Sequence, residues 1–127
     1  MTFRRAGERG QATVEFVLCL PIAALVLGIL IEIGLLVGDH VRLWHAARES
    51  ARIAIVDSDL EEIRSAAEHG GLSPLEVEVD PEFADRSTGR PLTVTLSYEP
   101  SGRLPLIGDL ISGRAMSSSA TMRIEQP

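Results

Sequence analysis

A long run without charge dominates the first third of the chain. No charged residue occurs from Phe16 to Ile31, and after Glu32 a second uncharged stretch continues to Gly38. The first run is a little shorter than the roughly 20 residues that a spanning helix needs, whereas residues 16–38 would give about 35 Å of helix. The pattern therefore predicts a membrane span with Glu32 toward its far interface, where a carboxylate costs less than at mid-bilayer. Pro21 lies in the first turns, where a membrane helix tolerates a lost hydrogen bond.

The helical pattern continues beyond this run. Apolar residues recur at three- and four-residue spacing through residues 39–56, which is the period of one helix face. The expected stripe consists of Val41, Trp44, Ala47 or Arg48, Ala51, Ala54 and Ile55. Because no proline or glycine occurs between Asp39 and Val56, one helix is expected from near Ala12 to Val56, with its second half outside the bilayer.

The rest of the chain predicts short elements. Capping-box spacing at 58–61, with Ser58 first, precedes an amphipathic helix that ends at Gly70-Gly71. Apolar and polar residues alternate at 75–80, 91–98 and 116–124, as in half-buried strands. The expected inward faces are Leu92, Val94, Leu96 and Tyr98 on the second strand, and Met116, Ser118, Ala120, Met122 and Ile124 on the third. Three antiparallel strands on the outer half of the long helix predict a small α+β domain.

The charges around the run predict its orientation. Arg4, Arg5 and Arg9 precede it against Glu8 alone, while the charges that follow it balance. The positive-inside bias places the N-terminus in the cytoplasm and the C-terminal domain outside. A cleavable signal peptide is the main rival, but the run is too long and residues 35–39 make a poor cleavage site. A buried helix of a soluble protein fits less well, since the rest of the chain is too small to cover it.

Composition and motifs argue against several classes of function. A net charge of −6 argues against nucleic acid as a partner. The single cysteine, Cys19, permits neither an intramolecular disulfide nor a cysteine-based metal site. His40 and His45 lie five apart on one helix, a poor metal pair. No phosphate loop or nucleophile motif occurs. We expect no enzyme activity, no metal, no cofactor and no small-molecule substrate.

Two further features of the long helix allow alternative interpretations. Trp44 is either an anchor at the membrane interface or a residue packed between helix and sheet. Gly34 and Gly38 have the spacing of a close helix–helix contact, although glycine is common in membrane helices.

The residues before the run point to a family. Gly10-Gln11-Ala12-Thr13-Val14-Glu15-Phe16 resembles the processing site of type IV prepilins, in which a short basic leader ends at glycine and glutamate follows five residues on. Together with "HAARESARIAIV" at 45–56, this segment is similar to the TadE-like proteins, minor pilins or pseudopilins of tight-adherence (Flp) pilus systems. Ser50 stands where that family usually has glycine. The resemblance is strong over residues 8–56 and thin over 57–127.

The resemblance implies processing and assembly. A prepilin peptidase would cut between Gly10 and Gln11, giving a leader (1–10), a transmembrane helix (11–38) and an extracytoplasmic α+β domain (39–127). The Glu15 carboxylate, with Phe16 beside it, would meet the new α-amine of a neighbouring subunit, a strongly coupled charge pair in low dielectric. Flp-type sites often have Tyr after the glutamate, where Phe16 stands here, and Gln11 differs from the Phe or Met that is usual at the first mature position of major pilins. The expected location is the cell membrane, single-pass, and the expected partners are the peptidase, other pilins and the Tad assembly platform. An uncleaved, membrane-anchored binding module is the alternative.

Overall fold

The computed structural model describes residues 8–56, 59–105, 107–110 and 112–125. The elements in order are α1 (Glu8–Ala54), α2 (Leu60–Glu68), β1 (Leu75–Asp80), the 3-10 turn η1 (Phe83–Asp85), β2 (Pro91–Tyr98), the 3-10 turn η2 (Gly108–Leu110) and β3 (Met116–Arg123). The predicted α+β class is confirmed. Residues 1–7 of the predicted leader, and Ser58, lie outside the described residues.

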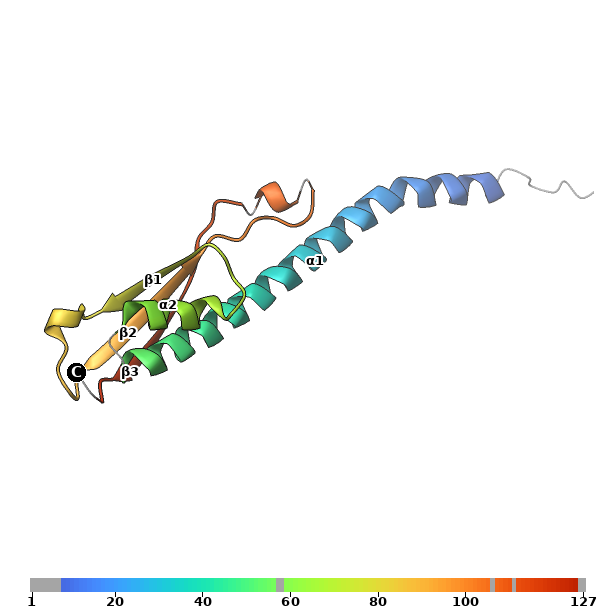
Figure 1. Ribbon diagram of the computed structural model, residues 1–127. Coiled ribbons are helices and arrows are strands. Elements are labelled where there is room, and N and C mark those ends of the chain that lie inside the picture. The colour runs from blue at the N-terminus through green and yellow to red at the C-terminus, as the bar shows by residue number, and fades with distance from the viewer. Residues whose placement is uncertain (1–7, 57–58, 106, 111, 126–127) are drawn as a thin grey trace, which may run out of the picture.

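Helix α1 is a single element that continues through Pro21, as the sequence predicts. Its N-terminal half projects away from the rest of the molecule, and its C-terminal half lies under the sheet (Figure 1). Every residue from 10 to 27 is exposed. A helix that is apolar all round and yet unburied needs an apolar environment from outside its own chain.

The sheet is antiparallel throughout, with strand order β1-β2-β3. Its register pairs Val77 with Leu96 and Val94 with Ala120, so the apolar side chains of all three strands share one face. The predicted inward faces are confirmed, because Leu92, Val94, Leu96 and Tyr98 are buried and the matching β3 positions are half-buried. The opposite face is polar.

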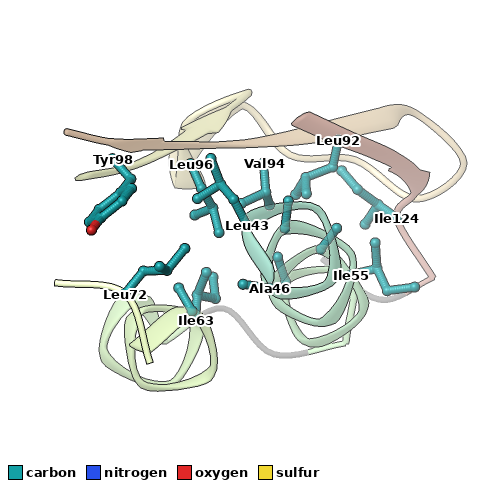
Figure 2. Packing of buried hydrophobic residues seen from close by; sticks show 14 residues of the cluster. Leu43, Ala46, Ile55, Ile63, Leu72, Leu92, Val94, Leu96, Tyr98 and Ile124 are labelled. Carbon is teal, nitrogen blue, oxygen red and sulfur yellow. The ribbon is translucent and has the colours of Figure 1, made fainter. Parts of the chain in front are cut away.

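The core lies between this sheet and the two helices. Side chains from β2 point toward Leu43 and Ala46 of α1 and toward Ile63 of α2 (Figure 2). Small residues on α1 allow close approach, and a Cβ built on Gly70, just after α2, would lie 3.2 Å from the Ala46 Cβ. The hydroxyl of Ser50, fully buried, donates to the Ile63 carbonyl at 3.3 Å and joins the two helices.

The predicted stripe is confirmed at Ala47, Ala51, Ala54 and Ile55, which are buried, and is wrong at Val41 and Trp44. Val41 and Trp44 are exposed, while Leu43, Ala46 and Ser50 take the buried positions. Alanines and serine let a sheet and a second helix come close, whereas the Trp44 indole would hold them apart. The packing interpretation of Trp44 is therefore wrong, and the interface interpretation stays a prediction. Trp44 is 42% exposed, and its ring instead stacks under the Arg48 guanidinium, 4.7 Å from the ring centroid.

The helix ends correct one detail of the capping prediction. The N-cap of α2 is Asp59, whose Oδ1 accepts from the Glu61 N–H at 3.0 Å. An aspartate satisfies a free first-turn N–H as well as the predicted serine would.

At the end of α1, Arg86 Nη1 donates to the Ala54 carbonyl at 3.3 Å. Partial burial there lowers the pKa of Arg86 below its ordinary value.

Candidate functional site

The predicted processing residues lie in the first turns of α1. The helix already begins at Glu8, so the Gly10–Gln11 peptide bond lies within its first turn. Gln11 and Glu15 are one turn apart on one face, and the Gln11 amide Nε2 donates to Glu15 Oε1 at 3.3 Å. Both residues are exposed, as is Phe16. The arrangement leaves the Glu15 carboxylate open to a donor from another chain.

Gly34 and Gly38 lie farther along the same helix. A Cβ built on either glycine would meet no atom within 4 Å. The surface around them is therefore open, and within the described residues neither glycine lies against a second helix. Their predicted role in close helix packing requires another chain and stays a prediction.

An ionic cluster that the sequence did not predict involves the two acidic residues that flank these glycines along α1. Glu32 and Asp39 are both 2% exposed, although both are acidic residues of α1. Arg103, from the connection between β2 and β3, covers both of them. Its backbone N–H donates to Glu32 Oε1 at 3.0 Å, and its Nη2 donates to the two Asp39 oxygens at 3.1 and 2.9 Å.

The electrostatics of this cluster are asymmetric. The hydrogen bond to the Asp39 carboxylate, followed by its charge, raises the pKa of Arg103, which keeps the guanidinium charged. Asp39 thus has a charge-assisted partner of the stronger kind. Glu32 Oε2, by contrast, is buried with no hydrogen-bond partner among the described residues. A buried carboxylate oxygen left without a donor is costly, so this part of the molecule requires a functional explanation.

The sequence contained a signal for the two acidic residues of this cluster but none for the arginine. Glu32 and Asp39 are seven residues apart, close to two helical turns, so they lie on the same face of α1. Nothing in the spacing pointed to Arg103, which lies 64 residues beyond Asp39 in an irregular segment. Only the tertiary path of that segment brings the three together.

The surface also has an open groove between α1 and α2. Glu49, Ile53, Glu62, Ser65, Ala66 and His69 line it. The Nδ1 atom of His69 already contacts the Ser65 carbonyl at the end of α2, as expected of a histidine near a helix end. Across the described ranges, no three His, Cys, Asp or Glu side chains lie together in a way that could hold a metal ion.

One helix in the described part of the chain is long and apolar enough to cross a membrane. Only 6% of its most apolar 18-residue window is buried, unlike the core helix of a soluble protein. The structure is thus consistent with a single-pass membrane protein.

Comparison with known families gives one match. Residues 10–52 match the family described as TadE-like protein, which confirms the resemblance over nearly the whole of α1. The match begins at Gly10 and extends past Ser50. No curated protein and no solved structure matched the chain. The family match suggests involvement in a Tad/Flp pilus system.

Proposed function

We propose, with the TadE-like match over residues 10–52 as the premise, that the chain is a minor pilin or pseudopilin that takes part in assembling a Flp/Tad-type pilus. A prepilin peptidase cleaves it between Gly10 and Gln11 at the cytoplasmic face of the cell membrane. The α+β domain lies outside. Its partners are the peptidase, other pilins or pseudopilins, and the assembly platform.

The observation that carries this proposal is the bare N-terminal half of α1. Large apolar side chains are exposed around this half, and Val14, Phe16, Leu18, Ile22, Leu25 and Leu27 are each more than half exposed. Such a surface is stable in a bilayer or against the apolar helices of neighbouring chains. A helix that exchanges lipid for neighbouring helices is what a membrane-stored subunit of a fibre needs.

Glu15 then has a specific role in assembly. Cleavage frees an α-amine at Gln11, while in the chain described here the Gln11 side chain contacts Glu15. The amine of a neighbouring subunit would replace this neutral hydrogen bond with a charge-assisted one, which is stronger. In low dielectric such a pairing favours one stagger between subunits.

The test is the N-terminus of the mature protein in cells with an active prepilin peptidase. Mass spectrometry should find Gln11 as the first residue. Gly10→Val should block the cut, because a branched side chain would stand at the scissile bond. Gly34→Val, in the open middle of α1, is the matched control and should leave the cut intact. An N-terminus at Met1 or Thr2 in the wild-type chain would contradict the proposal.

Assembly is tested separately from cleavage. Glu15→Gln removes the charge and keeps the shape, and it should reduce pilus assembly while the protein remains in the membrane. Glu49→Gln removes an exposed carboxylate from the covered half of α1 and serves as the control. Equal pilus yield from both variants would refute the assembly role of Glu15.

One observation favours the alternative, an uncleaved anchor with an extracytoplasmic binding domain. Because α1 begins at Glu8, the Gly10–Gln11 bond lies in helical backbone, which must unwind before a peptidase can reach it. The glycine at position 10 makes local unwinding easier. If the anchor interpretation holds, the N-terminus stays intact and Glu15→Ala leaves partner binding and pili unchanged.

A further inference from the structure

The connection between β2 and β3 does not stay beside the sheet. It turns back along α1 toward the N-terminal half, and η2 lies at its far end (Figure 1). Its described tip consists of residues 103–105 and 107–109, which we call the loop tip. A Cβ built on Gly28 would lie 2.7 Å from Ile107 Cδ1 and 3.9 Å from Leu104 Cδ1. The loop tip therefore reaches the apolar run of α1.

The position of Gly28 decides what the loop tip faces. Gly28 precedes Glu32 by one helical turn and borders the stretch, residues 10–27, in which every residue is exposed. Asp39, which Arg103 contacts, lies eleven residues from Gly28, about 16 Å along the helix. Leu104 and Ile107 thus lie beside the predicted span, and the Arg103 side chain lies at its outer end.

Two backbone N–H groups of the loop tip are paired near this boundary. The Arg103 N–H donates to Glu32 at 3.0 Å, and the Gly108 N–H donates to the Leu104 carbonyl at 2.8 Å. Gly102 and Gly108 approach so closely that a Cβ on either would clash with the other's backbone, which closes the loop. Irregular backbone at membrane depth is tolerated where protein buries it, and the packing of the loop tip on α1 contributes such burial.

We propose that the loop tip seats in the outer leaflet of the lipid bilayer. Leu104 and Ile107 are half-buried on α1 near Gly28, and their remaining surface contacts acyl chains. Arg103, 41% exposed at its side chain, holds the charged end to Asp39 at headgroup level. The loop shields the Glu32 carboxylate from lipid and fixes how deeply α1 inserts. The inference requires that α1 spans a membrane but does not require cleavage or pilus assembly, so the two proposals can fail independently.

Two features favour lipid over a protein as the occupant. The apolar surface of the loop tip is continuous with the all-round apolar surface of α1, which no single protein partner would cover. The side chains of the loop tip also change from apolar at Gly28 to charged at Asp39, the direction expected from hydrocarbon to water. The exposed Asp109 follows Gly108, which lies against Gly102 next to Arg103. Amphipathic elements that lie in the interface have this arrangement.

The test uses the full chain in vesicles of phosphatidylcholine and phosphatidylglycerol. Cys19→Ser removes the native thiol, and Ile107→Cys then carries an environment-sensitive nitrobenzoxadiazole label. Ser119→Cys, on the polar outer face of the sheet, carries the same label as a control. A lipid with a nitroxide high on its acyl chain should quench the label at 107 at least about twofold more than the label at 119, and aqueous iodide should show the reverse order.

A second pair of variants tests the seat itself. Gly28→Leu fills the space that Ile107 occupies, whereas Gly34→Leu adds the same bulk where nothing lies within 4 Å. Gly28→Leu should lower lipid quenching at 107, and Gly34→Leu should not. If Gly28→Leu inserts poorly into the vesicles, Arg103→Ala replaces it in this test, because that change removes the contact between the loop tip and the Asp39 carboxylate. Equal iodide quenching at 107 and 119 would overturn the proposal, as would a label at 107 shielded from both quenchers, since another protein would then cover the loop tip.

Discussion

Residues 10–27 and residues 43–54 belong to the same helix, yet one stretch is exposed on every side and the other supplies much of the domain core. The exposed stretch uses large branched side chains around its whole circumference. The covered stretch uses alanine and serine on its buried face, so that a sheet and a second helix can approach. The comparison shows that apolar character alone does not distinguish the two kinds of helix face. Side-chain size separates a face that packs closely in the domain core from one that contacts lipid or neighbouring helices.

Between the two stretches lies a junction with its own chemistry. Residues 28–39 meet the loop tip through Gly28, Glu32 and Asp39. The buried acids interrupt the apolar character of α1 between its exposed stretch and the stretch that packs in the domain. If α1 had only apolar residues here, no polar contact would fix the position of the loop tip along the helix.

The largest expected difference between the two stretches is in stability. Leu96→Ala, at a fully buried β2 position facing α1, should lower the free energy of unfolding of the domain by about 2–5 kcal/mol, because it leaves a cavity. Leu27→Ala, in the exposed stretch, should change it by less than about 0.5 kcal/mol. Urea unfolding in detergent micelles, followed by pulse proteolysis of the domain, measures both. Equal effects would mean that the exposed stretch is packed in the isolated chain.

The junction should show an intermediate effect. Asp39→Ala leaves the Arg103 guanidinium without its carboxylate and should cost about 1.5–3 kcal/mol, the range for a hydrogen bond to a charged group. Arg42 approaches the same carboxylate at 3.9 Å but is 62% exposed at its side chain, so Arg42→Ala should cost less than about 0.5 kcal/mol. The same unfolding assay compares them. A larger cost for Arg42→Ala would show that the wrong arginine has been assigned to Asp39.

Ser50 tests how the covered stretch joins α2. Ser50→Ala removes the hydroxyl that donates to the Ile63 carbonyl and should destabilise the domain by about 1 kcal/mol. Ser65→Ala, at an exposed α2 position, is the control and should be neutral or slightly stabilising, since alanine favours helix. A neutral Ser50→Ala would mean that the hydroxyl only replaces a bond to water.

These contrasts also show what the sequence could reveal. Period-2 alternation identified all three strands and their inward faces, because a strand has only two faces. The 3.6-residue period identified α1 and its buried Ala47, Ala51 and Ala54. It also placed the exposed Val41 and Trp44 on that face, since several stripes on an apolar helix fit the same spacing. The choice among them depends on the partner's shape. Glu15 was recognisable from a local motif, whereas Arg103 was not, because its contact depends on where a distant loop travels.

Trp44 tests that correction directly and has the smallest expected effect. Trp44→Ala removes the largest side chain on the covered stretch, yet it should cost only about 0.5–1 kcal/mol, mainly the stacking with Arg48. Its neighbour Leu43, fully buried, should cost about 2–5 kcal/mol as Leu43→Ala despite its smaller size. Pulse proteolysis suits both variants because it does not depend on tryptophan fluorescence. If the order were reversed, Trp44 would belong to the buried face of α1, as the hydrophobic spacing alone predicted.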